Sequence, residues 1–288
     1  MGIFKKPKVL MIAGAVALAV IIAAFFLLSP SKPKSVGVFG ADPQSQPFQL
    51  LQKQLDKAGY TLTFANAVDE VTTDCEVWIV RTESEEVAQQ IADAVGKKAI
   101  FIERKPALAQ AVRFVGWDME GAGMQMAGLL SRLPLGGDSN EDGTVSCLVL
   151  TSDAPQWQLG LDQGLVPLSV EVLQTLSCDL TEDAAKAVVT EALAQYGRDI
   201  EVILVSDDIL ATGAAAAIAG RGWVQGEDFY LLSTSCTESS LNALNEAQRS
   251  GLVLCREADF ANTLYDAVMD AIRGGVPKEF FASFQDYQ

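Results

Sequence analysis

Short apolar runs and amphipathic stretches alternate along most of the chain, from about residue 35 onward. The apolar runs are rich in β-branched residues, which is typical of buried strands, and the stretches between them repeat apolar residues at helical spacing. Such alternation predicts βαβ units, in which parallel strands form a sheet with helices on both faces. We expect strands at 36–39, 61–65, 76–80, 99–102, 145–150, 170–176, 202–205 and 229–232. We expect helices at 47–57, 85–95, 121–133, 182–196, 210–220 and 241–249.

The expected strands fall into two sets, one before about Val115 and one after about Gly143. The segment 133–143 between them is rich in Gly, Asp and Asn, and we assign it to the second set. In α/β lobes, the carboxyl ends of parallel strands line a crevice that takes small ligands. The predicted fold class is therefore α/β, with two Rossmann-like lobes of parallel sheet joined by a multi-strand hinge.

An apolar segment precedes the two lobes. Residues 9–28 form a run of 20 uncharged, mostly large apolar residues, and as a helix this run reaches about 30 Å, the thickness of a bilayer core. Three lysines stand before it, so the positive-inside rule puts residues 35–288 outside the cytoplasm. The sequence predicts one transmembrane signal anchor in the cell membrane, with residues 1–34 comprising a basic end, the anchor and a short tether. Cleavage of residues 1–31 as a signal peptide stays open, although the apolar run of such a peptide is shorter.

The charge and the residue types exclude several classes of function. The chain has 288 residues with 21 Lys+Arg against 37 Asp+Glu and no His, so its formal net charge is −16. Nucleic-acid binding needs clustered Lys and Arg, so we expect no nucleic-acid partner. The absence of His excludes Ser-His-Asp and Cys-His catalysis and imidazole-ligated metals. The five cysteines form no CxxC pair and lie mostly in or beside apolar strands. We therefore interpret them as small buried residues, and formation of one disulfide is the alternative.

Four motifs stand out in order along the chain. They are Phe-Ile-Glu-Arg-Lys-Pro at 101–106, Phe-Val-Gly-Trp-Asp at 114–118, Asp-Gly-Thr-Val-Ser-Cys-Leu-Val-Leu at 142–150, and Ile-Glu-Val-Ile-Leu-Val-Ser-Asp-Asp at 200–208. These motifs resemble those of the sugar-type (type I) periplasmic binding proteins, most of all their galactose/glucose-binding branch. The resemblance covers nearly all of residues 35–275 and implies two lobes that close over a monosaccharide.

The resemblance also implies that the chain crosses between the lobes three times. We expect these crossings near residues 115–117, 255–258 and 276–280. The expected first lobe takes residues 35–116 and about 256–278. The expected second lobe takes residues 117–255 and about 279–288.

Positions carried over from the family give a candidate ligand crevice with a divergent site. The resemblance implies these ligand residues: Phe48, Glu103, Gln156, Trp157, Asp162, Asp207 and Ser235. Glu103 and Asp207 stand where the family has Asn, and the family's His-x-Asp-x-x-x-Arg cluster becomes residues 156–162, ending in Asp162, so its basic group is lost. One explanation is a different solute, with these three acids selecting a polyol, an amine or a cation. The other is a crevice that binds no sugar, on a scaffold that meets a protein partner. A hydrolase with Glu103 and Asp207 as paired carboxylates has no further support.

Aromatic side chains near these positions offer stacking faces for the apolar side of a sugar. Trp157 and Trp117 are the candidates, although a lone Trp is more often a core or interface residue.

Residues 138–146 fit the first nine positions of an EF-hand-type calcium loop, with oxygen side chains at positions 1, 3, 5 and 9 and Gly at position 6. The acid expected at position 12 is missing, because Val149 stands there inside an apolar strand. A parallel neighbour strand should begin beside this loop at Glu201, and the resemblance gives a distant Glu the missing role. The ligands of a structural Ca²⁺ would be Asp138, Asn140, Asp142, Thr144, Ser146 and Glu201. The alternative is a plain polar turn.

Together these observations predict an extracytoplasmic, membrane-anchored solute-binding protein that is not an enzyme. It would close on a small polar solute, a sugar or polyol, for an ABC permease. The alternative is a sensory or structural module with a degenerate sugar site that engages a membrane protein.

Overall fold

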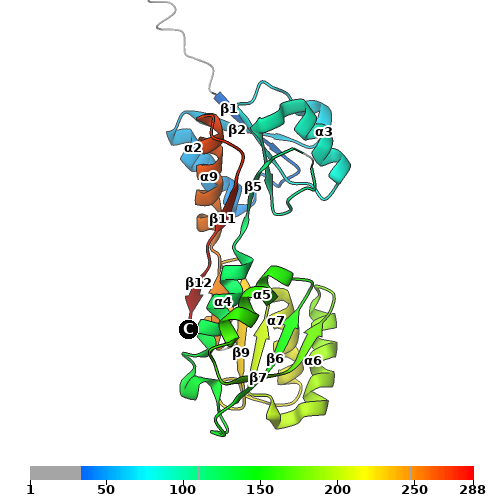
Figure 1. The fold of residues 1–288 in the computed structure, drawn as a ribbon, viewed down its shortest axis with the longest axis vertical. Helices are drawn as coiled ribbons and strands as arrows, with labels where there is room; N and C mark the ends of the chain where they lie inside the picture. The colour runs from blue at the N-terminus through cyan, green and yellow to red at the C-terminus, as the bar shows by residue number, and fades with distance from the viewer. Residues whose placement is uncertain (1–33, 109, 247) are drawn as a thin grey trace, which may run out of the picture.

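The computed structural model of the chain describes residues 34–108, 110–246 and 248–288. Figure 1 shows two lobes, one above the other, joined by several segments of chain. The expected anchor at residues 9–28 lies outside the described residues. Within the described ranges, no helix has the length and apolar character needed to cross a bilayer.

The first lobe contains a six-stranded sheet with the order β11-β5-β4-β3-β1-β2, in which all neighbours are parallel. Its strands are β1 (Lys34–Phe39), β2 (Tyr60–Ala65), β3 (Val77–Val80), β4 (Ala99–Ile102), β5 (Arg113–Trp117) and β11 (Glu279–Ala282). Its helices are α2 (Gln46–Lys57), α3 (Glu85–Val95) and α9 (Glu257–Ile272), with short 3-10 helices η1 (Val68–Glu70) and η2 (Gly96–Lys98). Helices α2 and α9 pack on one face of the sheet and α3 packs on the other.

The second lobe contains a six-stranded sheet with the order β12-β10-β9-β8-β6-β7, in which only β12 runs antiparallel to its neighbour. Its strands are β6 (Val145–Thr151), β7 (Val170–Ser177), β8 (Val202–Val205), β9 (Tyr230–Ser235), β10 (Gly251–Leu254) and β12 (Gln285–Tyr287). Its helices are α4 (Met119–Leu130), α5 (Pro155–Leu165), α6 (Glu182–Tyr196), α7 (Asp208–Ala219) and α8 (Ser240–Asn245), with 3-10 helices η3 (Pro134–Gly137) and η4 (Gly197–Asp199). Helices α4 and α5 cover one face, and α6 and α7 cover the other.

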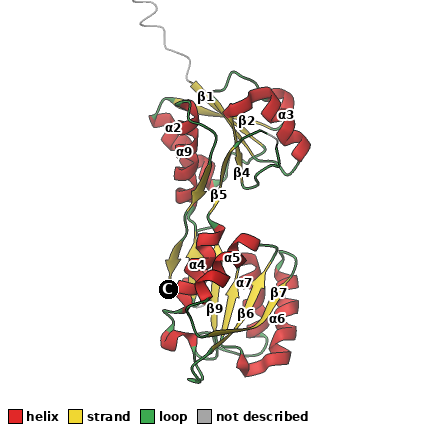
Figure 2. Cartoon of the chain, in the orientation of Figure 1, coloured by secondary structure: helices red, strands yellow, loops and turns green. Residues whose placement is uncertain are grey.

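These two lobes confirm the α/β class with parallel sheets (Figure 2). The inner strands β3, β4 and β8 are buried along their whole length, because helices cover both faces of each sheet. The expected helix at 241–249 instead ends at Asn245. The chain must then turn into β10, which is fully buried and pairs with β9.

Helices α4 and α5 cross at very short range, because glycines line their contact. A Cβ atom at Gly160 would collide with the carbonyl oxygen of Glu120, and one at Gly123 would collide with that of Trp157. Gly164 packs on Ala127 in the same way. The glycines therefore let α5 pack directly on α4, at the edge of the lobe that faces the hinge.

Three segments cross between the lobes: the β5–α4, β10–α9 and β11–β12 connections. The third lies at residues 283–284, later than the expected 276–280. The reason is that residues 279–282 pair with β5 and extend the first sheet, so they do not belong to the second lobe. Phe284 is buried after this crossing, and its carbonyl accepts a hydrogen bond from Gln125 Nε2 on α4 (3.0 Å).

Candidate functional site

The carboxyl ends of both sheets point toward the hinge, and a pocket of about 230 Å³ lies there between the lobes. We call it the interlobe pocket. Its walls are formed by Asp42, Ser45, Pro47, Phe48, Arg81, Glu103, Trp117, Cys236, Glu257 and Phe260. The first lobe, the second lobe and the second crossing all contribute, so the shape of the pocket depends on how far the lobes are closed.

Aromatic side chains form the apolar part of the wall. Phe48, in the first turn of α2, is buried and meets Phe64 edge-on at 6.1 Å between ring centroids. Trp117, at the end of β5, is partly buried and stacks on Phe260 of α9 at 5.1 Å. Such rings can cover the C–H face of a sugar.

Glu103 and Arg81 form the charged part of the first-lobe wall. Glu103 follows β4 directly, and its Oε2 lies 2.6 Å from Nε of Arg81, which follows β3. The backbone of Glu103 adopts φ 64°, a left-handed conformation that is costly for a residue other than Gly or Asn. Strain of this kind gathers at functional sites.

Asp207 begins helix α7 at the facing edge of the second lobe. One of its carboxylate oxygens accepts the N–H of Ile209 (2.7 Å), which caps the helix. Burial raises the pKa of Asp207, the Ile209 hydrogen bond opposes that shift, and the neighbouring Asp208 adds to it.

Cys236, just after β9, lines the interlobe pocket from the side of the second lobe. Burial raises the pKa of its thiol, and the nearby thiol of Cys255 together with the carboxylates of Asp207, Glu257 and Glu103 raises it further. Asp207 belongs to the second lobe and Glu103 to the first, and Glu257 lies at the second crossing, where α9 begins. In the pocket lining, the carboxylates of Asp42, Glu103 and Glu257 outnumber the one basic side chain among the described residues, Arg81.

The loop after β9 is held by its own hydrogen bonds. The hydroxyl of Ser235 lies 2.6 Å from that of Ser240 and accepts the N–H of Thr237 (3.1 Å). The N–H of Glu238 donates to the carboxylate of Glu257 (3.0 Å). This loop therefore carries Cys236 on a fixed backbone.

A second pocket of about 560 Å³, which we call the side pocket, shares Glu103 and Trp117 with the interlobe pocket. It is lined by Glu103, Lys105, Phe114, Gly116, Trp117, Asp118, Met119, Glu120, Gln156, Glu279 and Phe281. Lys105 and Glu279 form an ion pair of 2.6 Å on its rim.

The structure brings some of the expected ligand residues together and separates others. Phe48 and Glu103 line the interlobe pocket, and Gln156 lines the side pocket. Asp162 is exposed on α5, where it accepts a hydrogen bond from Gln158 (2.7 Å), and it lines neither pocket. Ser235 is buried in its hydroxyl network.

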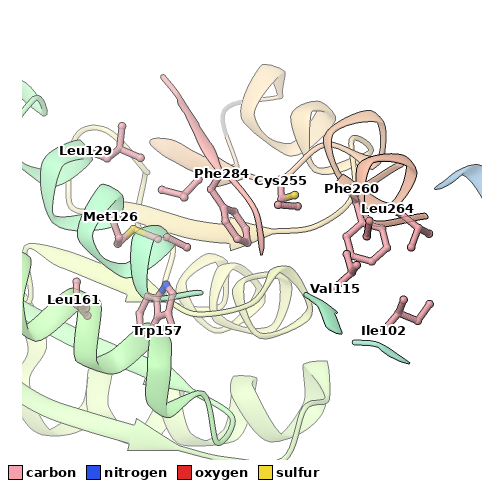
Figure 3. Close-up of a cluster of buried hydrophobic side chains, with 14 of the residues drawn as sticks. Ile102, Val115, Met126, Leu129, Trp157, Leu161, Cys255, Phe260, Leu264 and Phe284 are labelled. Carbon is pink, nitrogen blue, oxygen red and sulfur yellow. The ribbon is translucent and has the colours of Figure 1, made fainter. Parts of the chain in front are cut away.

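Trp157 does not offer a stacking face, contrary to expectation. It is fully buried between α4 and the sheet, and its Nε1–H donates to Thr234 Oγ1 (2.9 Å) (Figure 3). Helical periodicity points this side chain of α5 at the core and not at the crevice.

Sequence reasoning missed several residues of the interlobe pocket. Asp42, Arg81, Glu257 and Phe260 were absent from the expected set. Arg81 carries a usable signal, because it follows a fully apolar strand and therefore stands at the edge of the sheet where ligands bind. Glu257 and Phe260 carry no such signal, since they reach the pocket only through the second crossing.

The loop at 138–146 meets Glu201 at the far edge of the second sheet. The buried carboxylate of Glu201 accepts hydrogen bonds from N–H of Ser146 (2.8 Å), N–H of Asn140 (3.0 Å) and the hydroxyl of Ser139 (3.2 Å). Three expected calcium ligands accept backbone N–H groups inside the loop itself: Asp138, Asn140 and Asp142.

The hydrogen bonds to Glu201 and within the loop fit a loop that is held in shape by hydrogen bonds. Both oxygens of Glu201 already have protein donors. In the described part of the chain, no three Asp, Glu, Cys or His side chains gather closely enough to hold a metal ion. The calcium site stays a prediction.

No protein-family model and no curated protein matches the sequence. Solved structures do match the fold. An arabinose ABC transporter's periplasmic binding component from Shewanella sp. ANA-3 has a TM-score of 0.67 at 16% identity, covering 88% of this chain and 91% of that one. A glucose-galactose binding protein from Geobacillus stearothermophilus has a TM-score of 0.67 at 12% identity, covering 90% and 98%. A LacI-family repressor from Corynebacterium glutamicum has a TM-score of 0.62 at 14% identity, covering 88% and 97%.

The chain thus has the fold of the type I periplasmic sugar-binding proteins. At these identities the likeness establishes the fold alone. The repressor shows that one fold serves different functions, so the function must be argued from the pocket.

Proposed function

We propose that this chain, which has the type I periplasmic sugar-binding fold, is a non-catalytic solute-binding protein that closes on a small polar ligand. The observation that carries the proposal is the interlobe pocket itself. Aromatic and charged side chains of the first lobe and of α9 line it, and Cys236 of the second lobe faces them across the hinge. That combination suits a sugar or polyol, whose C–H face lies on aromatic rings while its hydroxyls bond to charged groups.

The three crossings support closure as the output of binding. A hinge of short segments lets two rigid lobes move as bodies, and a ligand held by both lobes favours the closed form. The solved neighbours include solute-binding proteins of carbohydrate transporters, so delivery to an ABC permease is the proposed role.

Membrane anchoring is part of the proposal and rests on the sequence. Residues 9–28 are long and apolar enough to span a bilayer. An anchor there would keep residues 35–288 at the outer surface of the cell membrane, close to a permease. The acidic surface of these residues would be repelled by anionic lipid and kept clear of it.

A sensory or structural module without a ligand is the second candidate. A crevice filled by side chains would favour it. The interlobe pocket keeps a volume of about 230 Å³ and an aromatic wall, which favours ligand binding.

Calorimetric titration of the full chain with a panel of pentoses, hexoses and sugar alcohols tests the proposal. We expect at least one member to bind with one-to-one stoichiometry and to raise the melting temperature. Substitution of Phe48 by Ala should weaken that binding. A chain that binds neither a member of this panel nor a charged derivative of one would overturn the proposal in favour of the second candidate.

A further inference from the structure

We propose that the interlobe pocket selects a sugar-sized ligand that carries a protonated amine, such as an amino sugar. The inference rests on the proposed function, because it names the class of solute that the same pocket takes.

The charge balance of the pocket favours a cationic ligand. Asp42, Glu103 and Glu257 line it, and within the described residues Arg81 is its only basic side chain. Arg81 is already paired with Glu103. A neutral ligand would leave the other carboxylates facing the pocket without a cation, whereas an ammonium group on the ligand would pair with them.

Carboxylates also stand at the carboxyl edges of both sheets. Glu103 follows β4 of the first lobe and Asp207 follows β8 of the second, while Glu257 lines the pocket at the start of α9. Closure would bring the first two nearer to each other. Like charges oppose that approach, so a cation between them would favour the closed form.

The spacing of these carboxylates argues against a bare metal ion. Calcium needs its oxygen ligands at about 2.3–2.6 Å from the ion, and among the described residues no acidic group of three is gathered so closely. Carboxylates around a wider space fit an organic cation, which spreads its contacts over a larger surface.

The aromatic wall supports the same conclusion. Trp117 is only partly buried, and Phe48 and Phe260 lie in the same pocket. Aromatic faces attract ammonium groups as well as the C–H face of a sugar. One wall can therefore hold both parts of an amino sugar.

The experiment compares matched ligands on the full chain. Glucosamine, galactosamine and mannosamine are titrated beside their parent hexoses and their N-acetyl derivatives, which have the same ring without the charge. We expect at least one amino sugar to bind about tenfold or more tighter than both of its neutral counterparts. Its binding should weaken with added salt, because screening acts on the charge alone.

Variants separate the pocket from the acidity of the whole surface. Asp207→Asn and Glu257→Gln should reduce the preference for the amino sugar, while Glu191→Gln, which removes an exposed acid of α6, should leave it unchanged. Circular dichroism shows that each variant is folded.

The possible results distinguish the two proposals. Neutral sugars that bind as tightly as their amino forms would overturn the amine inference and leave the proposed function intact. A panel in which neither amino nor neutral sugars bind would overturn both. A preference that Glu191→Gln reduces as much as Asp207→Asn does would also overturn the inference, because general surface charge would then explain it.

Discussion

Arg81 and Glu103 form an ion pair of 2.6 Å between the carboxyl ends of the neighbouring strands β3 and β4. Both residues line the interlobe pocket, and Glu103 also lines the side pocket. The pair holds the Glu103 carboxylate on the first-lobe wall while its backbone keeps a left-handed conformation. Glu103 therefore combines a carboxylate in the pocket wall with local backbone strain.

A comparison of Glu103→Asn with Glu103→Gln should separate the effect of the backbone strain on stability from the effect of the lost charge. Asn tolerates the left-handed region better than Glu, and an exposed ion pair contributes only about 0–1 kcal/mol. We expect Asn at this position to leave the free energy of unfolding unchanged or to raise it by up to about 1 kcal/mol. Glu103→Gln loses the charge and keeps the strain, so it should be the less stable of the two in urea denaturation. The opposite order would show that the backbone of Glu103 is not strained.

Gly160→Ala should destabilise the second lobe. The added methyl group would collide with the backbone of Glu120 in α4, and backbone cannot move aside as a side chain can. We expect a loss of about 2–3 kcal/mol in the free energy of unfolding. Gly128→Ala is the matched control in α4, because nothing lies within 4 Å of its added Cβ. That control should gain about 0.5–1 kcal/mol from helix propensity. Equal effects at the two glycines would contradict the close α4–α5 contact.

Glu201→Ala should destabilise the chain whether or not calcium binds. The change leaves the N–H groups of Asn140 and Ser146 without their acceptor, and we expect a loss of about 2–4 kcal/mol. Glu171→Ala, at an exposed position of β7, should change stability by less than about 0.5 kcal/mol.

Thermal melting with added Ca²⁺ tests the predicted metal site in the same loop. If the ion binds, Ca²⁺ raises the melting temperature of the wild-type chain and not that of Glu201→Ala. A wild-type melting temperature that Ca²⁺ does not change would show that hydrogen bonds alone hold the loop.

Asp207 should make the folded state less stable as the pH rises. Because burial raises its pKa above the ordinary value, the folded chain holds this proton at a pH where the unfolded chain has lost it. Stability from this group is therefore full below the ordinary pKa and is lost as the pH rises through the raised pKa. Asp207→Asn keeps an N-cap but has no carboxyl group to titrate. As the pH rises through the raised pKa, its free energy of unfolding should therefore increase relative to that of the wild type. Urea denaturation across this pH range measures the difference, and a constant difference would contradict the raised pKa.

Much of the fold could be predicted because periodicity is a local property. Strands such as β3 and β8 are continuous apolar runs, and the helices between them repeat at 3.6 residues, so the alternation alone indicates parallel sheets. The topology also places Glu201 beside the loop at 138–146, since neighbouring parallel strands start at the same edge. By contrast, β11 is short and only partly buried, and its pairing with β5 assigns it to the first lobe.

The candidate site was less predictable, because it depends on which face each side chain takes. Phe48 and Glu103 reach the interlobe pocket from positions that the strand and helix boundaries already mark. Trp157 stands one residue after Gln156, yet it points into the core while Gln156 lines the side pocket. A helix turns by about 100° per residue, so a shift of one position separates a ligand contact from a core residue.

The sequence by itself determined two α/β lobes, their acidic surface and the exclusion of histidine chemistry, because composition and periodicity are written along the chain. Only the tertiary structure decided that Arg81, Glu103, Cys236 and Glu257 share one pocket. These residues are far apart in sequence and come together through the crossings between the lobes. Their meeting depends on the packing of whole sheets and helices, which no local pattern records.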